Sequence, residues 1–121
     1  MSESDRTLTE RLQSVSMPAR KLFCVIVREA FHGPMHPKRS GTSVPAEVLE
    51  ACGLDVGEFY GLLSDLAQSG LVRLSGAYPF EEIALTEEAA PAETIAERCR
   101  QETIPLEHVL AADVDLSRFG A

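Results

Sequence analysis

The sequence predicts a mainly helical α+β protein with one small β-hairpin. Apolar residues recur at helical spacing in several separate stretches, which indicates amphipathic helices. Two β-prone runs, residues 71–75 and 82–86, flank a connector that contains Gly76 and Pro79, a pattern typical of a hairpin with a longer loop. The chain has 121 residues, enough for one hydrophobic core.

Composition excludes several broad classes of protein. Hydrophobic residues make up 45% and charged residues 25%, as in ordinary soluble proteins. No apolar run approaches the roughly 20 residues that cross a bilayer, and the polar start MSESDRTLTERL lacks the pattern of a signal peptide. We therefore expect a cytoplasmic protein with no membrane partner. Cys24, Cys52 and Cys99 are widely spaced, which favours free, buried or half-buried thiols over disulfides or zinc ligands.

The formal net charge of −8 is distributed unevenly along the chain. Residues 1–44 contain seven basic and four acidic residues, whereas residues 45–121 contain four basic and fifteen acidic residues. Contacts with phosphates supply most of the affinity of non-specific nucleic-acid binders. Any DNA contact is therefore expected to use the N-terminal part of the chain or a local basic patch.

Two helices are predicted in the N-terminal part. Thr7 and Glu10 match a capping box, and a narrow apolar stripe follows at Leu8, Leu12 and Val15. This short helix must pack on the body of the protein or on a second subunit. Pro18 suits the first turn of the central core helix, whose apolar residues are Leu22, Phe23, Ile26, Val27, Ala30 and Phe31.

A long connection over residues 32–43 follows the core helix. Its two histidines, His32 and His36, are four residues apart, but Pro34 between them prevents a regular helix from presenting both to a metal ion. Its pair Lys38 and Arg39 is the strongest local cationic patch, with a solvated surface pair as the alternative interpretation.

A pair of helices joined by a tight turn comes next. Ser43 is expected to cap the first helix, with Pro45 in its first turn, and Gly53 to end it in a left-handed conformation. Asp55 is expected to cap the second helix, which Gly70 ends. The apolar stripe of the second helix consists of Phe59, Leu62, Leu63, Leu66 and Ala67. Its other face presents Gly57, Glu58, Tyr60, Gly61, Ser64, Asp65 and Gln68.

The C-terminal part is predicted to be helical as well. A helix over residues 92–102 has a modest apolar stripe and ends before Ile104 and Pro105. Leu106, Val109 and Leu110 indicate one more short helix.

Residues 48–54, 55–70, 70–73 and 83–88 together resemble the winged helix-turn-helix superfamily, and in particular small bacterial transcriptional regulators of the multiple-antibiotic-resistance type. The resemblance implies a recognition helix in the DNA major groove, a wing at the DNA backbone or minor groove, and a two-fold dimer. We accordingly divide the chain into three segments: an N-terminal helical extension (1–17), a winged-helix domain (18–88) and a C-terminal helical extension (89–121) as a candidate dimer contact.

The resemblance assigns candidate binding residues by position. They are Gly57, Glu58, Tyr60, Gly61, Ser64 and Gln68 in the recognition helix, Arg73, Tyr78 and Phe80 at the wing, and Lys38 and Arg39 in the basic loop. Recognition helices that read DNA generally offer Arg, Lys, Asn, Gln, Ser or Thr. The predicted recognition helix carries Glu58 and Asp65 and no base, with Tyr60, Ser64 and Gln68 as its only neutral readers.

Two functional hypotheses follow. The first is a homodimeric transcriptional regulator that binds double-stranded DNA. The alternative is a winged-helix module that binds a protein partner and no DNA, with Tyr60, Tyr78 and Phe80 as anchors inside an acidic rim. For Tyr60 the competing interpretation is a half-buried helix residue, and for Phe80 a wing residue folded onto the core.

No enzymatic activity, cofactor or metal ion is expected. The sequence lacks GxSxG, phosphate-loop, HExxH and dinucleotide-binding motifs. Cys24 lies on the apolar core helix, which favours a core thiol over a nucleophile.

Overall fold

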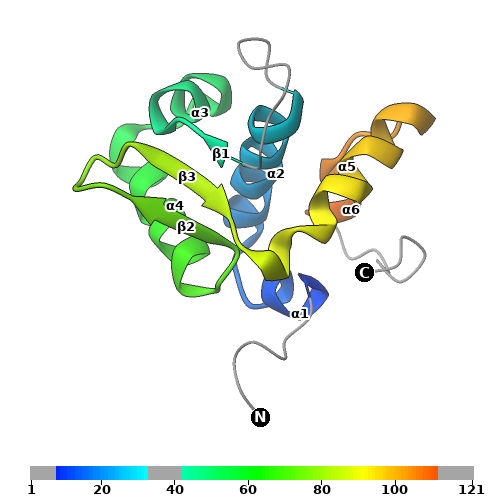
Figure 1. Cartoon of the computed structure of the whole chain (residues 1–121), viewed down its shortest axis with the longest axis horizontal. Helices are drawn as coiled ribbons and strands as arrows, with labels where there is room; N and C mark the ends of the chain where they lie inside the picture. The colour runs from blue at the N-terminus through cyan, green and yellow to red at the C-terminus, as the bar shows by residue number, and fades with distance from the viewer. Residues whose placement is uncertain (1–7, 33–41, 112–121) are drawn as a thin grey trace.

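The computed structural model describes residues 8–32 and 42–111, and only the backbone of Phe31 and His32 (Figure 1). Its helices are α1 (Leu8–Gln13), α2 (Met17–His32), α3 (Pro45–Cys52), α4 (Val56–Gln68), a 3-10 turn (Glu87–Ala89), α5 (Pro91–Glu102) and α6 (Glu107–Leu110). Its strands are β1 (Thr42–Ser43), β2 (Val72–Ser75) and β3 (Glu82–Leu85). These elements confirm the mainly helical α+β class.

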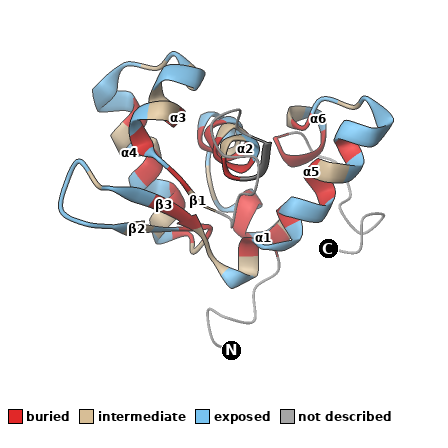
Figure 2. Ribbon diagram, turned by 45° about the horizontal axis from the view of Figure 1, so that its top comes forward, coloured by how far each residue is buried: buried red, intermediate tan, exposed pale blue. Residues whose placement is uncertain are grey.

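Helix α2 is the centre of the molecule. It contacts α3 and α4 on one side and α5 and α6 on the other, as well as strands β1 and β3 (Figure 2). Its side chains Leu22, Phe23, Ile26 and Val27 are all buried, which confirms the predicted core helix. The buried apolar side chains of α1, α5 and α6 belong to the same hydrophobic core.

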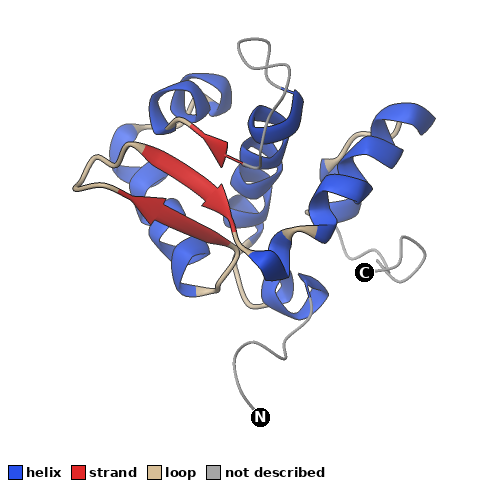
Figure 3. Cartoon of the chain, viewed as in Figure 1, coloured by secondary structure: helices blue, strands red, loops and turns tan. Residues whose placement is uncertain are grey.

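The sheet has three antiparallel strands in the order β1-β3-β2 (Figure 3). The predicted hairpin is present, with each strand beginning or ending within one residue of its predicted bounds. Strand β1 was not predicted, because two residues are too short to show an alternating pattern. It pairs Thr42 with Ala84 and Ser43 with Ile83.

The prediction that Ser43 caps α3 is wrong. Val44, with an extended backbone, occupies the capping position and provides no side-chain hydrogen bond. Pairing with β3 holds Ser43 inside the ladder, one residue too early to cap the helix. The Ser43 hydroxyl is buried and has no hydrogen-bond partner among the residues that the structure describes.

The two ends of α4 are fixed in different ways. At the start, the predicted cap is confirmed, because the Asp55 carboxylate accepts a hydrogen bond of 3.3 Å from the backbone N–H of Glu58. At the end, the buried Arg11 of α1 donates from Nη1 to the carbonyl oxygen of Ser69 at 2.7 Å. A cation here also complements the negative end of the helix dipole.

Close packing around Arg11 explains why residue 70 is a glycine. This residue has a φ of 82°, and a Cβ built on it would lie 1.9 Å from Nη1 of Arg11. A glycine therefore both adopts the left-handed conformation and leaves room for the guanidinium. The apolar pattern of α1 predicted the burial of Leu8 and Leu12 but gave no sign of this polar contact.

The C-terminal helices match their predictions. Helix α5 begins one residue before the predicted start, buries Ile95, Ala96 and Cys99, and ends at a left-handed Thr103. Helix α6 buries Val109 and Leu110. An ion pair between Arg28 of α2 and Glu107 of α6 adds a polar contact to this side of the core.

Several predictions concern residues that the structure does not describe. They are the capping box at Thr7, the basic loop with Lys38 and Arg39, and the tail after residue 111. Among the helices of residues 8–32 and 42–111, none has the length and apolarity that a membrane crossing requires. The segment boundaries after residues 17 and 88 stay predictions.

Candidate binding face on helix α4 and the hairpin

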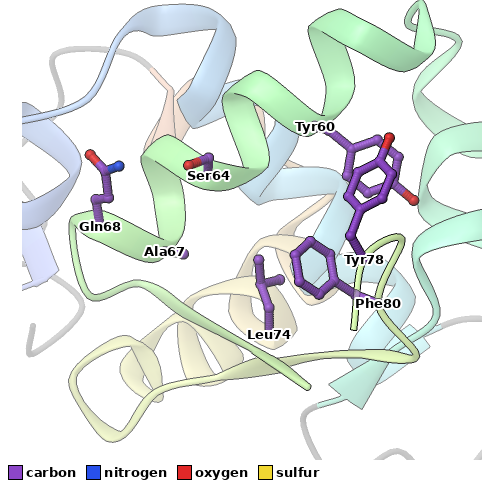
Figure 4. A pocket seen from close by; sticks show the side chains of 7 residues that line it. All are labelled: Tyr60, Ser64, Ala67, Gln68, Leu74, Tyr78 and Phe80. Atoms are coloured by element: carbon purple, nitrogen blue, oxygen red, sulfur yellow. The ribbon is translucent and has the colours of Figure 1, made fainter. Parts of the chain in front are cut away.

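An open groove of about 440 Å³ lies between α4 and the β2–β3 hairpin (Figure 4). Its lining combines side chains from the helix, from β2 and from the hairpin connector: Tyr60, Ser64, Ala67, Gln68, Leu74, Tyr78 and Phe80. Five of these seven side chains are apolar or aromatic, with Ser64 and Gln68 as the polar members. The groove is therefore suited to apolar groups of a ligand.

Three aromatic rings form one wall of the groove. The ring centroids of Tyr60 and Tyr78 are 4.9 Å apart, and those of Tyr78 and Phe80 are 5.9 Å apart in an edge-to-face arrangement. The Tyr60 hydroxyl donates to the carbonyl oxygen of Pro79 at 2.9 Å, which ties the connector to α4. The pKa of the Tyr60 hydroxyl is raised above its ordinary value. Burial is the larger cause, and the neighbouring Tyr78 is the smaller one.

The connector has an unusual backbone at Phe80. This residue has a φ of 72°, a left-handed conformation that aromatic residues rarely adopt. It is held by backbone hydrogen bonds from Phe80 N to Ala77 O at 2.7 Å and from Glu81 N to Ser75 O at 2.9 Å. Strained residues of this kind occur often in ligand-binding segments. The result here is an aromatic side chain turned toward the groove (Figure 4).

The exposed face of α4 has two further strips beside the groove. Gly57, Gly61 and Ser64 follow at intervals of four and three residues and are all exposed, so they form one line along the helix, here called the small-residue strip. Glu58 and Asp65 are seven residues apart and exposed, and they form a second line, here called the acidic edge. With 3.6 residues per turn, the small-residue strip lies between the groove and the acidic edge.

No cation faces the groove from the described part of α4 or the hairpin. Arg73 is the only Lys or Arg between residues 55 and 86. Strand pairing sets Leu74 opposite Ile83 and Arg73 opposite Ala84. Because side chains alternate between the two faces of a strand, Arg73 projects from the face opposite to that of Leu74, away from the groove.

The structure brings most of the predicted site residues together. Tyr60, Ser64, Gln68, Tyr78 and Phe80 line the groove, and Gly57, Glu58 and Gly61 lie beside it on α4. Arg73 is on the other face of the sheet. Lys38 and Arg39 lie outside the described residues.

The competing interpretations of the aromatic residues are also confirmed. Tyr60 and Phe80 are half-buried and pack against the core, whereas Tyr78 is 67% exposed. Two groove residues were not predicted from the sequence. Ala67 was assigned to the predicted buried stripe, although it lies seven residues after Tyr60 and therefore on the same side of α4. Leu74 was predicted only as a strand residue, and nothing in the sequence pattern indicates that it lines a groove.

The cysteines are free, as predicted. Cys24 and Cys99 are buried and Cys52 is half-buried. The pKa of the Cys24 thiol is raised to about 12, mainly by burial and to a smaller extent by the negative charge of Glu107. This thiol therefore stays protonated at neutral pH. Within residues 8–32 and 42–111, no cluster of three or more His, Cys, Asp and Glu side chains is arranged to hold a metal ion.

Comparison of the chain with protein families, curated proteins and solved structures found no match. Function is therefore inferred from the geometry and charge of α4 and the hairpin.

Proposed function

We propose that residues 18–88 form a winged helix-turn-helix, in which α3 and α4 are the helix pair and the β2–β3 hairpin is the wing. The element order α2, β1, α3, α4, β2, β3 supports this assignment, as does the left-handed Gly53 between the two helices. In such a fold the exposed face of α4 and the wing form the recognition surface.

We propose that this recognition surface binds a segment of another protein. The observation that carries the proposal is the aromatic groove, in which Tyr78 keeps 67% of its surface exposed beside half-buried Tyr60 and Phe80. Exposed aromatic side chains within a polar rim are a common feature of protein interfaces. The same fold serves unrelated functions in different proteins, so the site has to decide between them.

The charge of this surface argues against duplex DNA as the ligand. A protein gains affinity for DNA when its Lys and Arg side chains neutralise phosphates and release counterions. The exposed face of α4 offers Glu58 and Asp65 in their place, and the one Arg of the hairpin, Arg73, points the other way. Each acid close to a phosphate would lower the affinity.

A homodimeric DNA-binding transcriptional regulator is the second candidate function. The element order favours it, because a helix pair followed by a wing is the arrangement that places a helix in the major groove. In this case Lys38 and Arg39 would have to supply the phosphate contacts, since α4 has no cation.

A titration of labelled duplex DNA with the intact chain separates the two candidates. Measurements by fluorescence anisotropy at about 50 and about 200 mM salt cover the range in which phosphate contacts lose most of their contribution. We expect no saturable binding at either concentration. A salt-sensitive complex that weakens in Lys38→Ala and Arg39→Ala would overturn the proposal in favour of the second candidate. Light scattering on the same samples reports whether the chain is a homodimer.

A further inference from the structure

We propose that the partner segment is a basic amphipathic helix, which places apolar side chains in the groove and Lys or Arg side chains at the acidic edge. This inference rests on the proposed function, because it assigns a chemistry to the partner of the same recognition surface. Three adjacent features of α4 carry it: the apolar groove, the small-residue strip and the acidic edge.

The groove selects the apolar side of the partner. Leu74 and Ala67 form its floor beside the three aromatic rings (Figure 4). Its volume of about 440 Å³ accommodates more than one aliphatic or aromatic side chain. In helix-in-groove recognition, such anchors project from one face of the partner helix at helical spacing.

The small-residue strip allows the partner backbone to come close to α4. Gly57 and Gly61 have no side chain and Ser64 has a short one. Among the described residues, a Cβ built on Gly61 would meet no heavy atom within 4 Å, whereas one built on Gly57 would lie 3.3 Å from Oδ2 of Asp55. The space above the strip is therefore open at its centre, Gly61. Because the distance between packed helices depends on the side chains at their contact, a helix can lie close over this strip.

The acidic edge selects the polar side of the partner. Glu58 and Asp65 are two turns apart and exposed, and within the described residues neither forms an ion pair. A helix is about 10 Å wide with its side chains, so one that anchors in the groove and covers the small-residue strip can present cations to both acids. Complementary charges favour this orientation and reject acidic partners.

The same charges argue against a second copy of this surface as the occupant. An antiparallel two-fold contact between two α4 faces would bring the acidic edge of one copy against that of the other, and a parallel one would bring it against the apolar groove, which offers it no cation. Like charges that face each other across an interface reduce affinity. A basic amphipathic segment of a different protein can fill the apolar groove and also pair with the acidic edge.

Selection of displayed peptides on the intact chain tests the partner chemistry. A library of random peptides of about 16 residues, long enough for four turns, is selected on the chain and counter-selected on Gly61→Gln, which fills the strip at an exposed position. We expect enriched peptides to combine Leu, Ile, Met or Phe at helical spacing with Lys or Arg on the adjacent face.

The outcomes separate the inference from the proposed function. Enriched peptides that are neutral or acidic, but still discriminate against Gly61→Gln, would overturn the basic chemistry and leave a protein-binding surface. Failure to enrich any peptide that distinguishes the intact chain from Gly61→Gln and from Tyr78→Ala would overturn both.

Charge variants then test the acidic edge with the selected peptide. We expect the double variant Glu58→Gln, Asp65→Asn to bind about 3- to 20-fold more weakly, as two partly exposed ion pairs would predict. The double variant Glu87→Gln, Glu93→Gln, which removes two exposed acids outside α4 and the hairpin, is the matched control and should bind within about twofold of the unmodified chain. Equal affinity of the acidic-edge variant and the control would contradict the inference.

Discussion

Phe59 and Tyr60 are neighbours on α4 and belong to two different apolar regions. The Phe59 side chain is fully buried in the core, whereas Tyr60 lines the groove with Tyr78 and Phe80. Their ring centroids are only 4.9 Å apart, in an edge-to-face arrangement. The core is covered on all sides by elements of the chain, but the aromatic cluster remains open to solvent on one side. Apolar packing in the first region stabilises the fold, and in the second it leaves surface that a partner can cover.

Truncation of the two aromatic side chains should separate the regions most clearly. Phe59→Ala removes a buried ring and leaves a cavity, so we expect the free energy of unfolding to fall by about 3–5 kcal/mol. Tyr78→Ala at the exposed end of the cluster should cost less than about 1 kcal/mol. Denaturant unfolding of both variants measures the difference. Similar losses for the two variants would show that the aromatic cluster is part of the stabilising core.

Two left-handed glycines sharpen the comparison between packed and open positions. Gly70→Ala should destabilise the fold by about 2–4 kcal/mol, because it adds left-handed strain and displaces Arg11 from the end of α4. Gly53→Ala is the matched control, since Gly53 has a φ of 68° but a Cβ added to it would meet no heavy atom of the described residues within 4 Å. It should cost about 1–2 kcal/mol. Equal losses in denaturant unfolding would mean that the Arg11 contact contributes nothing.

Alkaline pH should weaken the core through Cys24. The folded pKa of this thiol is raised from 9.0 to about 12, so above pH 9 the unfolded chain loses a proton that the folded chain keeps. This contribution to stability is complete below pH 9 and is lost as the pH rises toward 12, at roughly 1.4 kcal/mol per pH unit. Unfolding measured from pH 8 to 11 should show a steeper decline for the unmodified chain than for Cys24→Ala. Parallel profiles would refute the assignment.

The smallest expected effect is a gain in stability. Gly61→Ala adds a methyl group in open space at an exposed helix position. Because alanine favours the helix over glycine, the free energy of unfolding should rise by about 0.5–1 kcal/mol. A thermal melt of this variant checks the rise. A loss of stability would indicate that the small-residue strip is packed against the chain itself and is not a free surface.

Much of the fold could be predicted from the sequence, because local signals and burial agree. The apolar spacing of α2, the Asp55 cap and the hairpin around Pro79 each depend on neighbouring residues. Strand β1 and the Ser43 position could not be predicted, because pairing with β3 depends on contacts about 40 residues away in the sequence. The Arg11 contact with Ser69 spans 58 residues and has no local signal.

The residues that line the groove were predicted from the sequence only in part, and the groove itself was not predicted. Position on the helix pair identified Tyr60, Ser64 and Gln68, and the exposed aromatic residues pointed to the connector. The groove itself arises from the tertiary contact of α4 with the hairpin, which brought in Ala67 and Leu74. The orientation of Arg73 likewise required the strand register.

The most direct test of the proposed binding face is an amide NMR titration of the intact, ¹⁵N-labelled chain with the selected basic peptide. We expect the largest chemical-shift changes at Gly57, Gly61 and Ser64 of α4 and at Tyr78 in the connector between β2 and β3, while amides of α5 and α6 stay nearly unchanged. Largest changes on α5 and α6, or saturable changes on α4 with duplex DNA in place of the peptide, would contradict a protein-binding role for this face.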